Sequence, residues 1–357
     1  MKIIKVAALA ASSKTSLNSG GSEEAFGNFN GTYYFDASFD YLSEIVQKEQ
    51  TILITDQHVY NSHSKIFDGW KTIVIPAGEV HKQQSTVDYI IGELIILQAD
   101  RNTFIVGVGG GVVTDISGYA ASIYMRGLKF GFVPTTILSM VDAAIGGKNG
   151  VDVGIYKNLV GLIKQPQFLL FDYSLLNTLP KDQWINGFAE IIKHACIKDA
   201  ELFAMLEAET VESFQKDKNK LAALIEKNVL IKTTVVVKDE FEKGERKLLN
   251  FGHTLGHAIE NSYLLPHGHA VSIGMIAACK IAENITHLNK EDINRIKALI
   301  EQYHLPVQFE FDKEKIWSVL KMDKKREGND INFILLSKIG EASIHTIPIK
   351  ELEQLIN

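Results

Sequence analysis

Histidines gather in one short part of the chain, where four of the eleven fall within seventeen residues. His253 and His257 are one helical turn apart and so share a face of a helix, and Glu260 follows a further turn along. Ten residues after His257 comes His267, and His269 follows it closely. Because imidazole and carboxylate groups are ordinary ligands of divalent cations, this cluster predicts a bound metal ion or the residues that support its ligands.

A carboxylate and an amine lie upstream, where Glu190 and Lys193 interrupt an apolar stripe at helical spacing. A charge placed near buried surface needs a partner, and a metal ion would be such a partner. Three protein ligands with open coordination positions are typical of a catalytic zinc-type site, whereas closed four-ligand cages are structural.

Three consecutive glycines, Gly109 to Gly111, directly follow an apolar strand-like run. Backbone N–H groups can approach an oxyanion closely here, and a helix over 112–121 would direct its positive end at it, so a dinucleotide is the natural ligand. A tight structural turn is the alternative, since the pattern is neither G-x-G-x-x-G nor a Walker loop. Asp56 at a strand end and Glu79 with Lys82 favour the nucleotide.

Residues 134–150 combine hydroxyls, an acid, a glycine pair and Lys148, and Lys157-Asn158 follows. Two lysines and an amide could converge on one phosphate although the chain carries a net charge of −6. The alternative is a surface loop with unrelated lysines. Further along, the charged residues from 232 to 250 indicate a segment that contacts the substrate.

The elements that must position these groups change along the chain. Short apolar runs at 51–56, 71–76 and 102–109 predict buried strands, and 83–100 has helical periodicity, so a parallel α/β sheet is expected. After one more strand at 168–172, the pattern is mainly helical. We therefore predict a loose leader over 1–28, a Rossmann-like NAD-binding α/β domain over 29–172 and a mainly α-helical metal- and substrate-binding domain over 173–357.

Composition excludes several classes of protein. The chain has 357 residues, of which 46% are hydrophobic and 22% charged, as in a globular protein with a sizeable core. Its net negative charge offers nucleic acid no general attraction. The two cysteines have no metal-ligand or redox spacing, the apolar start is too short for a signal segment, and no apolar run would cross a membrane. We expect a cytoplasmic protein.

From about Asp56 to its C-terminus the sequence resembles the 3-dehydroquinate synthase family of sugar phosphate cyclases. The resemblance rests on the triple glycine, on Ser139–Asp142 with Gly146-Gly147-Lys148, on Ala189-Glu190-Ile191-Ile192-Lys193 and above all on the string from Arg246 to His257. It implies a lyase of the shikimate pathway that converts 3-deoxy-D-arabino-heptulosonate 7-phosphate to 3-dehydroquinate and phosphate. The implied steps are transient oxidation by NAD, β-elimination, reduction and intramolecular aldol closure.

The resemblance also implies NAD, one zinc or cobalt ion, a homodimer and particular site residues. The metal ligands would be Glu190, His253 and His267, with His257 beside them as a catalytic residue. Substrate contacts would be Asp142, Lys148, Asn158, Lys193, Lys232, Arg246, Asn250 and Lys324. NAD contacts would be Asp56, Gly78, Glu79, Lys82, Gly110, Gly111, Val112, Asp115, Thr135, Thr136, Lys148, Lys157 and Thr178.

The sequence departs from the family pattern at a few positions. The family has Glu where this chain has His269, Gly where it has Thr114, and Ser in place of Ala143 or Ala144. His269 could compete for the metal or alter the choice of substrate. The other functions that we consider are a metal-dependent polyol dehydrogenase, a different sugar phosphate cyclase and a non-catalytic binding module.

Overall fold

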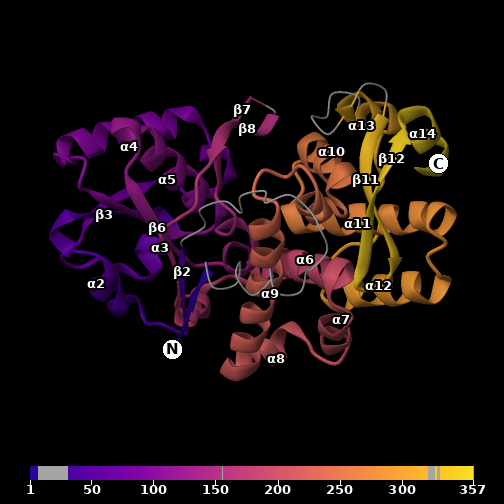
Figure 1. Cartoon of the computed structure of the whole chain (residues 1–357), viewed down its shortest axis with the longest axis horizontal. Helices are drawn as coiled ribbons and strands as arrows, with labels where there is room; N and C mark the ends of the chain where they lie inside the picture. The colour runs from indigo at the N-terminus through magenta and orange to yellow at the C-terminus, as the bar shows by residue number, and fades with distance from the viewer. Residues whose placement is uncertain (7–30, 155, 321–325, 328–329, 357) are drawn as a thin grey trace, which may run out of the picture. The chain divides into compact units, whose positions relative to one another are not determined.

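The computed structural model describes residues 1–6, 31–154, 156–320, 326–327 and 330–356 (Figure 1). The chain divides into two compact units, which are described separately. Unit 1 comprises Met1–Pro180 and Leu221–Phe241, and unit 2 comprises Lys181–Lys220 and Glu242–Asn357. Among the described residues, no helix combines the length and the apolarity that crossing a membrane requires.

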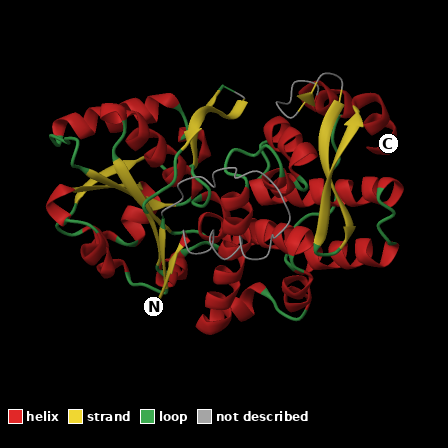
Figure 2. Ribbon diagram, in the orientation of Figure 1, coloured by secondary structure: helices red, strands yellow, loops and turns green. Residues whose placement is uncertain are grey.

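Unit 1 is built on a seven-stranded sheet with the strand order β1-β2-β9-β6-β5-β3-β4. β1 and β2 are antiparallel, whereas the other neighbouring strands are parallel, which confirms the expected fold class (Figure 2). The strands are β1 Lys2–Lys5, β2 Thr32–Phe35, β3 Thr51–Asp56, β4 Lys71–Ile75, β5 Phe104–Gly109, β6 Lys129–Pro134 and β9 Phe168–Phe171.

Buried apolar runs form β3, β5 and β9, as the sequence pattern predicts, and also β6, which the sequence analysis did not predict. In β3 the residues from Thr51 to Thr55 are all buried, and the Thr55 hydroxyl donates to the carbonyl of Val108 at 2.8 Å. A polar side chain is therefore satisfied inside the sheet. In the described part of unit 1, the helices that connect or follow these strands are α2 Leu42–Ile45, α3 Gln57–Ser62, α4 Gln84–Ile96 and α5 Gly111–Ile123. α5 packs against β5 and β6, and α4 packs beside it.

The segment 134–150, predicted to bind phosphate, leads from β6 through a π-helical turn, Ser139–Ala143, into a separate hairpin. The hairpin consists of β7, Lys148–Val153, and β8, Tyr156–Ile163, paired antiparallel. α5 packs against β7. The sequence did not predict this hairpin.

The division into units differs from the predicted boundary at residue 172. Asp172 to Pro180 is packed within unit 1, because the Asp172 carboxylate accepts from the backbone N–H of Phe39 at 2.8 Å and Leu175 lies in the hydrophobic core. Helix α9, Lys218–Lys238, also returns residues from 221 onward to unit 1. Of the predicted loose leader, Lys2–Lys5 is not loose, since it pairs with β2, and residues 7–28 lie outside the described part of the chain.

Unit 2 is mainly helical, as expected, and carries a small antiparallel sheet that packs on α11 (Figure 1). Its helices are α6 Lys181–Lys198, α7 Ala200–Glu207, α8 Val211–Lys216, α10 His253–Tyr263, α11 His267–Ile285, α12 Lys290–Gln302, α13 Lys313–Leu320 and α14 Ile349–Ile356. Its strands are β10 Arg326–Glu327, β11 Asp330–Lys338 and β12 Glu341–Pro348.

Glycines let α10 and α11 pack closely. A Cβ at Gly274 would lie 1.9 Å from the carbonyl oxygen of Gly252, and a Cβ at Gly256 would lie 2.9 Å from that of Ala270. Larger residues would therefore force the two helices apart. This contact holds the two histidine-bearing helices next to each other.

Candidate functional site

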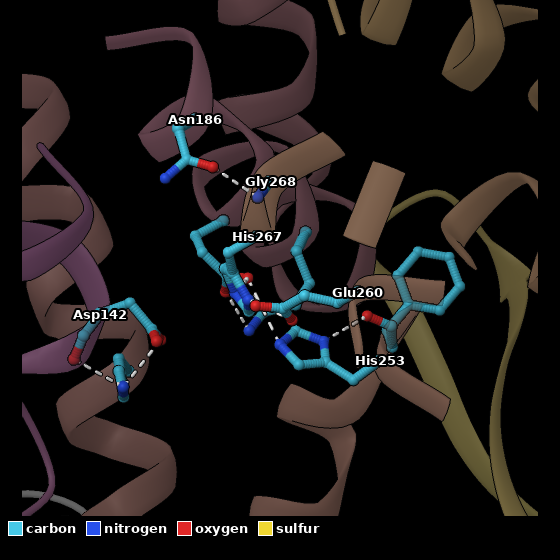
Figure 3. A network of polar contacts seen from close by, with 10 residues as sticks. Asp142, Asn186, His253, Glu260, His267 and Gly268 are labelled. Carbon is cyan, nitrogen blue, oxygen red and sulfur yellow. Dashed lines mark hydrogen bonds and ion pairs between the residues drawn. The ribbon is translucent and has the colours of Figure 1, made fainter. Parts of the chain in front are cut away.

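Three side chains from three helices of unit 2 converge on one point. Figure 3 shows two of them, His253 and His267, close to each other. Glu190 of α6 is fully buried, and its Oε1 lies 3.4 Å from Nε2 of His253 and 3.3 Å from Nε2 of His267. Two ligand atoms each about 2.1 Å from a tetrahedral zinc ion lie about 3.4 Å apart. The residues present therefore fit a zinc-like cation, with Glu190, His253 and His267 as its ligands.

The other ring nitrogen of each of these histidines is also engaged. Nδ1 of His253 lies 3.1 Å from the carbonyl oxygen of Phe251, and Nδ1 of His267 lies 3.2 Å from Oε2 of Glu260. Burial lowers the pKa of His267, but its hydrogen bonds with Glu190 and Glu260 more than offset this and raise the pKa to about 10. Partners at Nδ1 leave Nε2 as the nitrogen directed at the centre.

The position of His267 depends on how α11 begins. The backbone N–H of Gly268 donates to Oδ1 of Asn186 on α6 at 2.5 Å (Figure 3). A Cβ at Gly268 would lie 2.3 Å from the carbonyl oxygen of Asn186, so the close contact needs glycine. Asn186 lies on α6 one helical turn before Glu190 and fixes the first turn of α11. The sequence analysis did not identify it.

The remaining two histidines of the cluster differ in their surroundings. The ring of His257 lies edge-on to that of His253, with centroids 5.0 Å apart. His257, Glu260 and His267 form a second group with ligand atoms within 4.8 Å of one another. His269 belongs to none of the candidate metal groups found among the described residues. The structure therefore does not support competition by His269 for the metal.

The structure shows the burial or the polar partners of three of the predicted substrate residues of unit 2. Lys193 is buried and forms an ion pair with Oε2 of Glu190, so the two oxygens of that carboxylate have different partners. Arg246 is buried in the 3-10 helix Glu245–Asn250, and Asn250 donates from Nδ2 to Glu242 at 2.6 Å. Lys324 lies outside the described residues.

In unit 1 a buried lysine joins residues that the sequence assigned to two different ligands. Lys82 donates from Nζ to Asp115 at 2.5 Å and to the side-chain oxygen of Asn158 at 2.6 Å. Burial lowers the pKa of Lys82, but the charges of Asp115 and Glu79 more than offset this, so its pKa is raised. The structure thus brings the predicted NAD contacts Lys82 and Asp115 together with the predicted substrate contact Asn158. Lys157 lies 3.5 Å from Glu79.

A second buried lysine, Lys232 of α9, forms an ion pair with Asp142 of the π-helical turn. Lys232 is buried and donates from Nζ to the carboxylate of Asp142 at 2.7 Å and to its backbone carbonyl at 2.6 Å. Both are predicted substrate contacts, and the structure brings them together. Lys148, by contrast, is exposed at the start of β7 after two glycines of positive φ, Gly146 and Gly147.

The triple glycine leads into the N-terminus of α5 with Gly110 as its N-cap. A Cβ at Gly110 would lie 3.2 Å from Thr136, and one at Gly111 would lie 3.1 Å from Ala143. The predicted NAD contacts Gly110, Gly111 and Thr136 are therefore neighbours, and Thr135 is tied to Gly109 by a backbone hydrogen bond of 3.0 Å. Val112 follows in the first turn of α5.

One of the departures from the family pattern is accommodated in this turn. The hydroxyl of the buried Thr114 donates to the carbonyl of Gly111 at 3.0 Å. The extra hydroxyl is thus satisfied inside α5. The departure at Thr114 therefore leaves no buried hydroxyl unsatisfied.

The other predicted NAD contacts lie at the carboxyl end of a strand or in the segment that follows one: Asp56 ends β3, Gly78 follows β4, and Thr178 ends the 3-10 helix Tyr173–Thr178 after β9. Asp56 caps α3, accepting from the backbone N–H of Val59 at 2.9 Å. Thr178 lies 2.6 Å from Nε2 of His63, a residue that the sequence analysis did not select. Gly78 has a φ of 107° and leads into the turn with Glu79.

Comparisons with known proteins agree with this arrangement. Residues 72–186 match the family model described as 3-dehydroquinate synthase N-terminal, and residues 187–326 match 3-dehydroquinate synthase C-terminal. A 3-dehydroquinate synthase from Thermoanaerobacter pseudethanolicus is 38% identical over 342 residues, covering 91% of this chain and 96% of the relative. One from Pyrococcus abyssi is 40% identical over 286 residues, covering 80% of this chain and 84% of the relative.

Solved structures of similar shape are sugar phosphate cyclases and dehydrogenases. A 2-epi-5-epi-valiolone synthase from Streptomyces hygroscopicus with NAD+ and Zn2+ bound has a TM-score of 0.84 and 26% identity, covering 95% of this chain and 98% of that one. A 2-deoxy-scyllo-inosose synthase complexed with carbaglucose-6-phosphate, NAD+ and Co2+ has a TM-score of 0.81 and 25% identity, covering 93% and 98%. A butanol dehydrogenase from Thermotoga maritima, with a TM-score of 0.65 and 13% identity, covering 91% and 95%, shares the fold alone.

Proposed function

Because the chain belongs to the 3-dehydroquinate synthase family, we propose that it converts 3-deoxy-D-arabino-heptulosonate 7-phosphate to 3-dehydroquinate and phosphate, with NAD and a divalent cation. One observation carries the proposal. Glu190, His253 and His267 come from three helices, yet Oε1 of Glu190 lies 3.4 Å and 3.3 Å from Nε2 of the two histidines, about the separation of two ligands on a tetrahedral cation. In solved cyclases of similar fold the cation is Zn2+ or Co2+ beside NAD+.

The cofactor-binding residues are proposed from the same resemblance. When bound, NAD would take and return the hydride at C5, and the cation would polarise the hydroxyl groups of the substrate. The N-terminus of α5 would direct its backbone N–H groups at the pyrophosphate. The full set of proposed NAD contacts is Asp56, Gly78, Glu79, Lys82, Gly110, Gly111, Val112, Asp115, Thr135, Thr136, Lys148, Lys157 and Thr178.

The chain's own cations would bind the substrate and support the loss of phosphate. From the family resemblance, Lys148, Asn158 and Arg246 are each proposed as contacts of the substrate phosphate, and the two cations would stabilise the charge that develops as it leaves. Lys193 would contact the substrate next to the metal ligand Glu190, because the two side chains form an ion pair. The remaining proposed substrate contacts are Asp142, Lys232, Asn250 and Lys324.

His257 is proposed as a proton relay or as a donor that orients the substrate. Its ring lies against that of His253 at 5.0 Å without supplying a ligand to the Glu190 group. A side chain in that place can hold a proton close to the reacting atoms.

The direct test incubates the purified protein with the substrate, NAD and Zn2+ or Co2+. Phosphate and dehydroquinate are expected in equal amounts with no net NADH, because the hydride is returned. Failure of a demonstrably metallated protein to release phosphate would refute the proposal. Accumulation of NADH would indicate a polyol dehydrogenase. Release of phosphate with a different carbocyclic product would indicate another sugar phosphate cyclase. Binding of NAD and metal without turnover would indicate a non-catalytic module.

We further propose that the enzyme is a cytoplasmic homodimer, which the family resemblance favours. Size-exclusion chromatography with light scattering is expected to give twice the chain mass of 39.7 kDa. A single-chain mass over a range of concentrations would contradict the dimer.

A further inference from the structure

His267 lies between two carboxylates, and only one of them belongs to the proposed ligand set (Figure 3). We propose that Glu260 is a positioning residue. Its carboxylate accepts a hydrogen bond from Nδ1–H of His267 and so holds Nε2 of that ring toward Glu190 and the metal ion. This inference rests on the proposed function for the identity of the metal site. It assigns Glu260 a role in holding the ligand.

The distances favour a direct hydrogen bond between Glu260 and His267. Glu260 is 4% exposed, and its Oε2 lies 3.2 Å from Nδ1 of His267, which is a hydrogen-bond distance. Nε2 of the same ring lies 3.3 Å from Oε1 of Glu190. A carboxylate that is removed from water in this way needs a donor, and the imidazole N–H supplies one.

The placement of Glu260 also links two helices. Glu260 lies two helical turns beyond His253 on α10, while His267 is the first residue of α11. One helix therefore carries a proposed ligand and also holds the ligand of the next. The three residues 264–266 between the helices leave the ring of His267 little freedom once Glu260 has engaged it.

The two histidine ligands are held by different kinds of acceptor. Nδ1 of His253 faces a neutral backbone carbonyl, that of Phe251, at 3.1 Å. A carboxylate acceptor polarises an imidazole more strongly than a carbonyl does and makes the opposite nitrogen a better metal ligand. Glu260 is therefore expected to contribute to metal affinity through His267.

A second metal ion is the alternative, because His257, Glu260 and His267 also have ligand atoms within 4.8 Å of one another. With Nε2 of His267 at the first ion, a second ion would have to take Nδ1 of the same ring. A neutral imidazole would then lose its remaining proton, which it keeps at ordinary pH. One ion per chain is therefore expected.

The test measures metal binding by the full-length protein rather than turnover. The variants are Glu260→Ala, Glu260→Gln and, as a matched control, Glu291→Gln, which removes the same charge from an exposed position on α12 of the same unit. Zn2+ affinity is measured by competition with a chelating dye, and Co2+ binding by its visible ligand-field absorption. Glu260→Ala is expected to weaken Zn2+ binding about 10- to 100-fold and to shift the Co2+ bands.

Glu260→Gln keeps an acceptor oxygen without the charge, so it is expected to restore part of the affinity. Glu291→Gln is expected to match the wild type. Wild-type affinity in both Glu260 variants, or two Zn2+ ions per wild-type chain with one in Glu260→Ala, would overturn the inference. Should Glu260→Ala fail to fold, the isosteric Glu260→Gln decides alone, because wild-type affinity and an unshifted Co2+ spectrum in that variant would also overturn it.

Glu190→Ala separates this inference from the proposed function. If Glu190→Ala binds Zn2+ as the wild type does, the metal site itself is wrong. If Glu190→Ala loses the ion while the Glu260 variants keep it fully, only the role of Glu260 is refuted.

Discussion

Asn149 of β7 occupies the space that a side chain at Gly118 of α5 would need. A Cβ at Gly118 would lie 1.9 Å from Oδ1 of Asn149. The Nδ2 of Asn149 donates to the carbonyls of Gly147 at 2.7 Å and Lys164 at 3.0 Å. One buried amide therefore packs the start of β7, next to Lys148, closely against α5, while its hydrogen bonds fix the glycine turn and the end of the hairpin.

This contact predicts opposite outcomes for two Gly→Ala substitutions within helices. Gly118→Ala is expected to destabilise the protein by about 1–3 kcal/mol through overpacking against Asn149. Gly92→Ala on α4 is expected to stabilise it by about 0.5–1 kcal/mol, because nothing lies within 4 Å of the new Cβ and alanine favours helix. Urea unfolding measures both. Equal stability of the two variants would contradict the close packing of Gly118.

The buried pair of Lys232 and Asp142 predicts a loss of stability on substitution of the lysine. Lys232→Met removes the ammonium group that lies 2.7 Å from Oδ1 of Asp142. The expected loss is about 2–3 kcal/mol, reduced from that of a fully buried pair because the Asp142 side chain is 21% exposed. The urea midpoint is compared with that of Lys238→Met, an exposed lysine of the same helix. If both variants unfold at the same midpoint, the ion pair does not stabilise unit 1.

Helical periodicity could place the histidines on one face but could not rank them. His253 and His257 are equivalent by spacing, yet only His253 directs Nε2 at Glu190, at 3.4 Å. The difference arises from how α10 packs against α11, which itself packs on α6, and the first of these contacts depends on glycines such as Gly256 and Gly274. Such packing joins residues far apart in the chain and leaves no local period. The family resemblance, unlike the spacing, did favour His253.

The strands β3, β4, β5 and β9 of unit 1 could be predicted because buried parallel strands are continuous apolar runs, as in β3 and β9, whereas β1, β2 and β6 were not predicted. The hairpin of β7 and β8 could not, since most of β8 is exposed and β7 follows a glycine pair. The return of α9 to unit 1 was also missed. It depends on long-range contacts, such as that of Lys232 with Asp142, which no local pattern records.

The proposed metal ligands predict a sharp loss of metal retention on truncation. Glu190→Ala and His267→Ala each remove one of three ligands, so tight binding of Zn2+ is expected to fall at least about 100-fold while the helical content persists. Metal analysis after dialysis measures the retained Zn2+, and circular dichroism measures the helical content. His58→Ala, at an exposed position on α3, is the control. Full occupancy in both ligand variants would refute the assignment.

The two cysteines predict a pH dependence of stability. Both are buried thiols, and burial raises the pKa of Cys279 to about 12 and raises that of Cys196 as well. An unfolded thiol has a pKa of about 8.5. The neutral thiols therefore stabilise the fold fully below about pH 8.5, and this contribution falls as pH rises toward the folded pKa.

Two measurements check this dependence. A thiol reagent at pH 8 is expected to label neither cysteine in the folded protein and both of the chain's two cysteines in urea. Between pH 9 and 11, the unfolding free energy of Cys279→Ala is expected to fall less steeply than that of the wild type, because one ionising thiol has been removed from the unfolded state. An identical slope, or labelling of the folded protein at the rate of the unfolded chain, would contradict the burial of the Cys279 thiol.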